Sequence, residues 1–230
     1  AVESGSRGCG FAAPDSDYDV RCIDVRPKED YLRLEKIRDV IELPLDDVRD
    51  INGWDLQKAL RLLYKSNPTL FEWAASPIVY METEFAGQFR NVMNTYFSTK
   101  KSLYHYISMA EGNYREFLRG ANVKAKKYFY VMRPVLACRW ILEKGTPPPM
   151  RFTELMAAEL PGTLHSEMEH LLELKMNAPE IKEIPRIDVL NEYLDTSITE
   201  IKNLLLDMDD TKKMEWEILN QMFLKFISVN

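Results

Sequence analysis

The sequence predicts an α+β fold, in which a small mixed sheet with flanking helices is followed by a mostly helical region. Two observations predict this class. Up to about Tyr80 the chain mixes turn-rich loops with short β-like runs, and beyond it long stretches have the apolar spacing of helices. A chain of 230 residues can bury a sizeable core. We therefore expect a first domain over 1–80 and a helical domain over 81–230.

The composition excludes several classes of protein. With 46% hydrophobic and 29% charged residues, the chain is neither a disordered tail nor a fibrous protein. No apolar run is long enough to cross a bilayer, and three scattered cysteines (Cys9, Cys22 and Cys138) predict neither a disulfide framework nor a zinc site. The net charge of −6 excludes a continuous cationic coat, although not a local basic groove. We expect a cytoplasmic protein with no membrane partner.

The first region contains the predicted strands. Residues 1–3 resemble the end of a strand that runs into a turn over 4–10, where three glycines permit close approach of a ligand. Because the chain starts without Met inside this strand-like segment, we expect part of the core to precede Ala1. Alternating or β-branched runs predict further strands at 18–25, 40–45 and 48–51. A turn is predicted at 52–53 and a helix at 54–64.

The second region is predicted to be helical. Its apolar residues recur at helical spacing, and consecutive prolines at 147–149 interrupt the pattern because proline cannot continue a helix. A second break lies over 177–185. The predicted helices are 82–96, 99–119, 121–143, 152–159, 164–176, 186–206 and 211–227.

An acidic pair and a glycine–serine turn carry the predicted chemistry. Alternate residues of a strand share a face, so Asp17 and Asp19 present neighbouring carboxylates, which repel unless a cation lies between them. Mg²⁺ suits that position because it prefers oxygen ligands and keeps sites for water and phosphate. Gly5 and Ser6 offer backbone N–H groups and a hydroxyl to phosphate oxygens, and Arg7 adds a charge-assisted contact. The pattern predicts a site for a nucleoside triphosphate and Mg²⁺.

A third carboxylate is needed for a site with two metal ions. Asp50 is favoured because it lies in a short β-like run that can pair beside the acidic strand. Asp55 is the alternative, but in the first turn of a helix its charge is explained by the helix N-terminus. Asp46 and Asp47 are predicted loop residues.

Several spaced motifs resemble the polymerase-β-type nucleotidyltransferases, and more closely the branch that includes RNA-repair-pathway enzymes. The similarity covers roughly the first 145 residues. It is carried by the segments 5–7, 16–21, 50–58, 67–73, 76–80 and 127–134. The resemblance implies a nucleotidyltransferase-type sheet with a helical extension. It also implies two Mg²⁺ ions, with Mn²⁺ as an alternative, held by Asp17, Asp19 and the third carboxylate.

The third predicted helix alternates cations with aromatic residues. Lys127 and Arg133 are the cations that we expect to bind the triphosphate or a nucleic-acid acceptor. The alternative interpretation is a core helix with a charged outer face. Arg21, on the acidic strand, is expected either to orient a metal ligand or contact phosphate, or to form an ion pair with Asp19 or Asp24.

Together these features predict a Mg²⁺-dependent enzyme that moves a nucleoside monophosphate from an NTP to an acceptor hydroxyl and releases pyrophosphate. The resemblance favours an RNA 3′ end as the acceptor, and a protein or a small molecule is the alternative. Two other functions remain to be distinguished: a non-catalytic nucleotide- or RNA-binding module, and a metal-dependent phosphohydrolase. The sequence indicates neither the base preference nor the oligomeric state.

Overall fold

The computed structural model describes residues 1–44, 48–177, 183–209 and 214–228. The chain divides into two compact units. The first comprises Ala1–Gly8, Asp17–Phe97 and the described residues of Thr211–Asn230, and the second comprises Cys9–Ser16 and the described residues of Ser98–Asp210. This grouping by contacts is not a test of the domains expected over 1–80 and 81–230, which stay a prediction.

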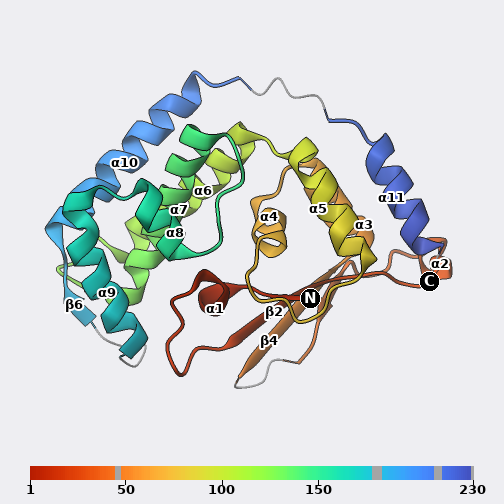
Figure 1. The fold of residues 1–230 in the computed structure, drawn as a ribbon, viewed down its shortest axis with the longest axis horizontal. Coiled ribbons are helices and arrows are strands. Elements are labelled where there is room, and N and C mark those ends of the chain that lie inside the picture. Colours follow the sequence, from red (N-terminus) through yellow and green to blue (C-terminus); the bar gives the residue numbers. More distant parts are fainter. Residues whose placement is uncertain (45–47, 178–182, 210–213, 229–230) are drawn as a thin grey trace. The chain divides into compact units, whose positions relative to one another are not determined.

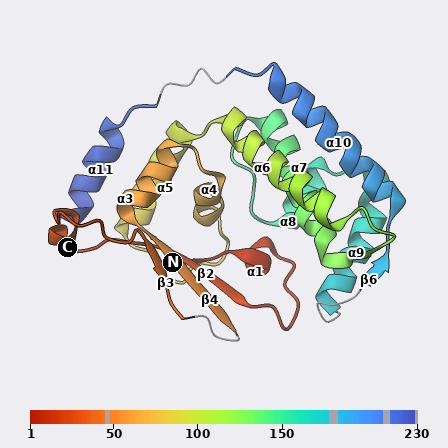
Figure 2. The same ribbon diagram turned by 180° about the vertical axis from the view of Figure 1, so that it is seen from behind.

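The first unit contains the mixed sheet that the sequence predicts. Its strands run in the order β1-β2-β4-β3, with β2 and β4 parallel and the other neighbours antiparallel. Figure 1 shows β2 and β4 side by side, and Figure 2 shows β3 beside β4 from behind. The bounds are Val2–Glu3 for β1, Tyr18–Asp24 for β2, Val40–Glu42 for β3 and Arg49–Asp55 for β4. The expected α+β class is confirmed.

The register of β2 and β4 decides which side chains share a face. Asp19 lies opposite Asp50, and Ile23 lies opposite Trp54. Because side chains alternate along a strand, Asp19, Arg21 and Asp50 project from the same face of the sheet.

The predicted turn at 52–53 is wrong, because Asn52 and Gly53 lie inside β4. Their turn propensity is overridden by pairing with β2, which continues along the whole of β4. The following helix α3 (Leu56–Tyr64) therefore begins at Leu56 rather than at 54. Asp55 is its N-cap, and the Asp55 carboxylate accepts a hydrogen bond of 2.8 Å from the backbone N–H of Gln57.

Helices pack on this sheet through apolar side chains. α3, α4 (Pro68–Ala74) and α5 (Glu84–Tyr96) bury Leu56, Leu63 and Leu70 completely. Trp54 of the sheet stacks on Trp73 of α4, with ring centroids 4.1 Å apart. α11 (Glu217–Ile227) returns from the end of the chain to lie beside α3, as Figures 1 and 2 both show. Two short helices, α1 (Gly5–Cys9) and α2 (Lys28–Tyr31), follow β1 and β2.

The second unit is built around α7 (Ala125–Lys144), which is apolar on nearly every side. Tyr128, Met132 and Leu136 of this helix are fully buried. Phe11 joins this core by packing on Phe129, with centroids 5.2 Å apart. The surrounding elements are α6 (Thr99–Phe117), α8 (Phe152–Glu159), the 3₁₀ turn Gly162–Leu164, α9 (His165–Asn177) and α10 (Asp188–Leu206).

Most of the predicted helices are confirmed within a few residues of their bounds. An exception is the start of the helix expected over 121–143, where Asn122–Lys124 instead form strand β5, paired with β6 (Glu183–Pro185). The helix expected over 211–227 is described from Glu217, and residues 211–213 lie outside the described part of the chain.

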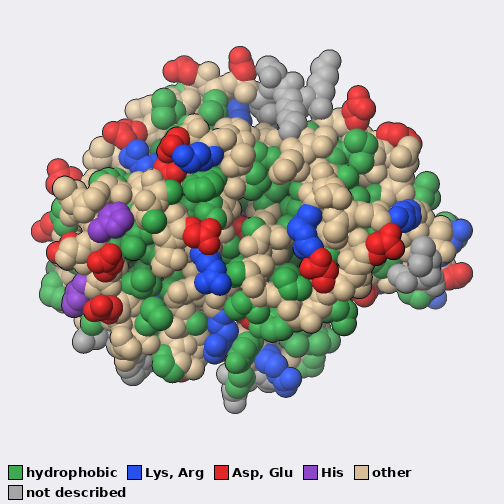
Figure 3. All heavy atoms as spheres, in the orientation of Figure 1, with side chains coloured by type: hydrophobic (Ala, Val, Ile, Leu, Met, Phe, Trp, Pro, Cys, Tyr) green, Lys and Arg blue, Asp and Glu red, His purple; other side chains and the backbone are tan. Residues whose placement is uncertain are grey.

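Two further observations concern membrane crossing and surface charge. Among the described residues, no helix is long and apolar enough to cross a membrane. On the face drawn in Figure 3, Asp and Glu side chains are interspersed with Lys and Arg side chains.

Gly53 is required by the closeness of β2 and β4. A Cβ atom at this position would lie 2.4 Å from the Cys22 Sγ. We expect Gly53→Ala to lower the free energy of unfolding by about 1–3 kcal/mol through overpacking, measured by urea denaturation. Cys22→Ala in the same chain restores part of that loss. Gly87→Ala is the control, because a Cβ in that helix meets nothing within 4 Å. Equal losses in Gly53→Ala with and without Cys22→Ala contradict this explanation.

Candidate active site

The structure brings two of the three predicted carboxylates together. Asp19 and Asp50 are register partners, and both form ion pairs with Arg21. The Arg21 Nη2 atom lies 3.0 Å from the Asp19 Oδ1 and 2.7 Å from the Asp50 Oδ2. Its Nη1 atom also donates to the backbone carbonyl of Asp50 at 2.7 Å. Of the two ion-pair partners that the sequence left open for Arg21, the structure therefore shows Asp19, and it adds Asp50.

Gly5, the first residue of α1, lies directly against Asp19. A Cβ atom on Gly5 would lie 1.8 Å from the Asp19 Oδ2, so any larger residue displaces that carboxylate. The Gly5 backbone has φ +53°, which glycine adopts without strain. The Ser4 N–H also donates to the Asp19 carbonyl at 2.8 Å. Gly5 and Ser6, which were expected in a turn, thus form the start of helix α1 and lie beside the acidic strand.

A buried carboxylate that the sequence analysis missed forms a hydrogen bond with the backbone of Asp19. Glu3 is fully buried, and its Oε1 atom accepts a hydrogen bond of 3.0 Å from the Asp19 backbone N–H. Its Oε2 atom accepts from the Tyr80 hydroxyl at 2.5 Å. Desolvation and this bond to Glu3 raise the pKa of Tyr80 to about 12. The only signal for Glu3 in the sequence was a charged residue inside a short strand-like segment.

The charge of Asp19 is unfavourable in this environment. Burial raises the pKa of the Asp19 carboxyl above its usual value, and the charges of Glu3, Asp50 and Asp17 raise it further, while Arg21 opposes them. The guanidinium therefore does not fully compensate the combined effect of burial and of the neighbouring carboxylates. A further cation near Asp19 is electrostatically favoured.

Asp17 and Arg7 lie next to each other at the start of β2. The Asp17 side chain is exposed, and its backbone carbonyl accepts from the Arg7 Nε at 3.2 Å. The Arg7 guanidinium lies over the ring of Tyr18, 4.0 Å from its centroid. Ser6 is half-buried in α1. In the described part of the chain, no three His, Cys, Asp or Glu side chains are grouped closely enough to hold a metal ion.

Asp55, the alternative third carboxylate, already has hydrogen-bond and ion-pair partners within the chain. Besides capping α3, it accepts a hydrogen bond of 2.6 Å from the Tyr31 hydroxyl and lies 3.8 Å from the Arg26 Nε. It lies at the opposite end of β4 from Asp50. Its contacts favour Asp50 as the third carboxylate, which stays a prediction. Asp46 and Asp47 lie outside the described residues.

The two predicted cations of the helical region belong to the second unit. Arg133 is buried, and its Nε and Nη2 atoms donate to the Met150 carbonyl at 3.4 Å. The Lys127 Nζ lies 3.5 Å from the ring centroid of Phe117 and 4.7 Å from that of Tyr130. These contacts give both side chains a packing role. Their binding to phosphate stays a prediction.

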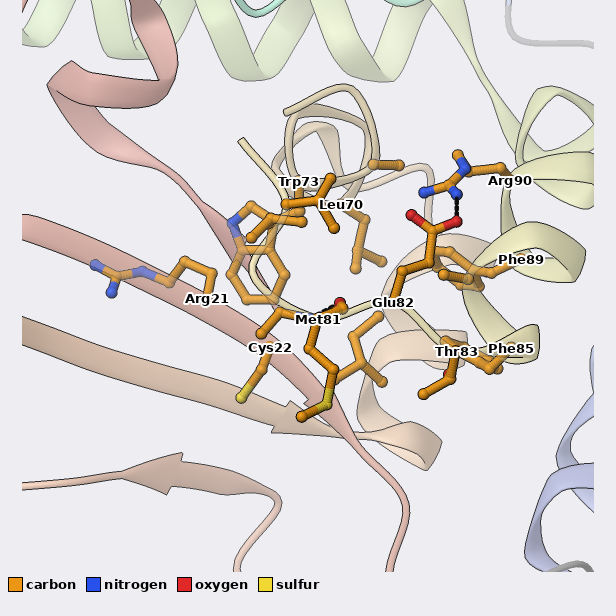
Figure 4. A pocket seen from close by; sticks show the side chains of 16 residues that line it. Arg21, Cys22, Leu70, Trp73, Met81, Glu82, Thr83, Phe85, Phe89 and Arg90 are labelled. Carbon is orange, nitrogen blue, oxygen red and sulfur yellow. Dashed lines mark hydrogen bonds and ion pairs between the residues drawn. The ribbon is translucent and has the colours of Figure 1, made fainter. Parts of the chain in front are cut away.

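An apolar pocket of about 120 Å³ lies beside Arg21 in the first unit. Trp73 and Leu70 line one side of it and Met81 the other, while Glu82 and Arg90 form an ion pair within its lining (Figure 4). The Arg21 side chain lines the pocket, but its guanidinium points away from the other lining residues, in agreement with its ion pairs to the carboxylates.

The raised pKa of Asp19 makes a prediction about stability. Because the folded chain binds the Asp19 proton more tightly than the unfolded chain, ionisation of Asp19 removes stability as the pH rises through its folded-state pKa. We expect Asp19→Asn to raise the melting temperature at pH 7 without divalent cations. The gain should shrink as the pH falls toward the usual pKa range of Asp.

Thermal denaturation across a pH series measures this effect, with Asp24→Asn at the exposed end of the same strand as the control. A gain that is the same at every pH contradicts the assignment to ionisation of Asp19.

Known proteins resemble this chain over nearly its whole length. Residues 1–225 match the RNA repair pathway DNA polymerase beta family. Over 231 aligned residues the chain is 48% identical to "Uncharacterized protein YcgL" of Bacillus subtilis (strain 168), an alignment that covers 99% of this chain and 88% of that protein. No solved structure matches the chain. The family match confirms the resemblance seen in the sequence motifs: the chain belongs to the RNA repair pathway DNA polymerase beta family.

Proposed function

We propose that the chain is a nucleotidyltransferase, which moves a nucleoside monophosphate from an NTP to an acceptor hydroxyl and releases pyrophosphate. The observation that carries this proposal is the juxtaposition of Asp19 and Asp50 on parallel strands, with Gly5 at the start of α1 packed against Asp19. Family membership supports the same reaction class.

Two of the proposed donors, Asp19 and Asp50, lie together and have the chemistry that suits magnesium. Carboxylate oxygens are the ligands that Mg²⁺ prefers, and burial together with the charges of Glu3, Asp50 and Asp17 raises the pKa of Asp19. We propose that Asp17, Asp19 and Asp50 hold two Mg²⁺ ions, or Mn²⁺ ions in their place. Bound metal would lower the pKa of the acceptor hydroxyl and offset the charge of the phosphates. Arg21 supplies part of the positive charge and keeps Asp19 and Asp50 together.

The residues at the start of α1 are proposed to bind the triphosphate. Backbone N–H groups in the first turn of a helix have no partner within that helix, so those of Gly5 and Ser6 suit the β- and γ-phosphates. The Ser6 hydroxyl and the Arg7 guanidinium add a donor and a positive charge. This arrangement stabilises pyrophosphate as it leaves.

Transfer then requires a single displacement at the α-phosphorus. The acceptor oxygen forms a bond to that phosphorus as the bond to the bridging oxygen of pyrophosphate breaks, and that oxygen keeps the electron pair. The hydroxyl proton passes to Asp50. Its side chain is 40% exposed, compared with 28% for Asp19, so Asp50 is the more accessible carboxylate. An RNA 3′ hydroxyl is the acceptor that we favour, with a protein or small-molecule hydroxyl as the alternative.

The reaction is tested with α-labelled NTPs, Mg²⁺ and a pool of RNA. Asp17→Ala, Asp19→Ala and Asp50→Ala should each lower label transfer by at least about 100-fold, because each removes a carboxylate from the reacting centre. Asp24→Ala, at the far end of β2, should retain transfer.

Circular dichroism verifies that the variants fold. Undiminished transfer by Asp19→Ala or Asp50→Ala contradicts the proposal. Release of inorganic phosphate without any acceptor would indicate a phosphohydrolase, and NTP binding with no product across RNA, protein and small-molecule acceptors would indicate a binding module.

A further inference from the structure

A second candidate site lies at the opposite end of the parallel strands. A hollow of about 330 Å³ follows β2 and β4 at their carboxyl ends, between the segment 26–39 and the start of α3. The region outside the carboxyl ends of parallel strands is a common place for ligands in open α/β sheets. From Asp19 to Asp24 the length of β2 is roughly 17 Å at the ordinary rise of a strand, so this hollow is separate from the paired carboxylates.

Positive charge is concentrated around this hollow. Among the described residues that line it, basic side chains outnumber the acidic side chains Asp30, Glu35, Asp39 and Asp55. The basic ones are Arg26, Arg33, Lys36, Arg38, Lys58 and Arg61. A local positive excess in a chain of net charge −6 indicates an anionic ligand.

The acidic residues of the hollow are largely paired. Lys58 lies 3.3 Å from Asp39, and Arg33 pairs with both Asp30 and Glu35. The buried Asp55 is satisfied by Gln57, Tyr31 and Arg26, as described above. In contrast, the ion pairs formed by the described residues include neither Lys36 nor Arg61, and both side chains are exposed. These two cations can neutralise a ligand without breaking an ion pair.

An aromatic hollow adjoins the basic one. It has a volume of about 360 Å³, shares Gln57 and Arg61 with the basic hollow, and is completed by Trp216 and Phe223 beside α3. The Trp216 ring stacks on Tyr64 with centroids 3.7 Å apart and planes at 9°, yet Trp216 is 44% exposed. Phe223 packs edge-on against Tyr31, which lines the basic hollow. The ring of Trp216 is therefore held rigidly at the surface.

Basic side chains beside an exposed, immobilised aromatic ring are the pattern that binds single-stranded nucleic acid, in which phosphates contact cations and bases stack. We propose that the two hollows bind a single-stranded RNA segment, with its phosphates at Lys36 and Arg61 and a base against Trp216. The proposal deepens the proposed function, because it identifies this RNA as the acceptor. Two adjoining hollows that share Arg61 fit a strand of several nucleotides better than a mononucleotide.

The test is a binding measurement without NTP or divalent cation, so that it does not depend on catalysis. Fluorescence anisotropy follows a labelled single-stranded RNA of about eight nucleotides. Arg61→Glu should weaken binding at least about tenfold and reduce its salt dependence, because a phosphate contact is lost. Trp216→Ala should weaken binding with the salt dependence unchanged. Trp216→Phe, which keeps an aromatic ring on Tyr64, should retain most of the affinity.

Lys65→Glu is the matched control, because it reverses one charge at the end of α3 outside both hollows. Equal weakening by Lys65→Glu and Arg61→Glu overturns the proposal, as does the absence of RNA binding by the unmodified chain. Competition by ATP as strong as that by the unlabelled RNA would identify a free nucleotide as the ligand and also overturn it.

The two proposals fail in different ways. If RNA does not bind but label transfer to a small-molecule acceptor depends on Asp19 and Asp50, the RNA site is wrong and the enzymatic function stands. If RNA binding depends on Arg61 and Trp216 but no acceptor gains a nucleotide, the RNA site stands and the enzymatic function is wrong.

Discussion

The parallel pairing of β2 with β4 is the constraint on which the candidate active site depends. Its register places Asp19 opposite Asp50, and two carboxylates at neighbouring positions of a sheet repel each other. Arg21 lies two residues beyond Asp19 on the same face, so its guanidinium reaches both side chains. A shift of the register by one residue moves Asp50 to the other face of the sheet and separates the pair. The site is therefore a consequence of strand pairing.

The same arrangement places acidic side chains in positions that lower the stability of the fold. Glu3 is fully buried next to Asp19, and Gly5 allows the start of α1 to approach that carboxylate more closely than any other residue permits. Such a cluster costs stability, since burial and the charges of Glu3, Asp50 and Asp17 raise the pKa of Asp19. Such a group is typical of functional sites, whose ligand supplies the missing charge.

Much of this organisation could be predicted from the sequence, for identifiable reasons. The strand at 18–25 and the long helices have strong apolar periodicity, which tertiary contacts reinforce. The turn expected at 52–53 failed because asparagine and glycine report a local propensity, whereas pairing with β2 is a long-range contact. Helix α4 was missed because it is short, although Asn67 caps it and Pro68 begins it, which together are a start signal. The β5–β6 pair joins segments about sixty residues apart, which no local pattern reveals.

The site residues also divide into those that the sequence predicts and those that it does not. Asp17, Asp19 and Gly5 lie in one compact motif, so that spacing alone indicates their chemistry, and Asp50 needed only the expectation that its strand pairs beside theirs. Glu3 could not be predicted because its role depends on its complete burial and on its hydrogen bond with the Asp19 backbone N–H.

Parallel strands also explain why two separate sites are expected on one small sheet. Because β2 and β4 run in the same direction, both amino ends lie at one edge and both carboxyl ends at the other. The amino-end edge presents Asp19 and Asp50, the proposed metal ligands, whereas the opposite edge leads into a hollow lined by an excess of basic side chains. In the proposed complex, an RNA strand contacts both edges, with its backbone at Lys36 and Arg61 and its terminal hydroxyl at the carboxylates. This separation of charge keeps the acceptor's phosphates away from the acidic residues that its reacting end requires.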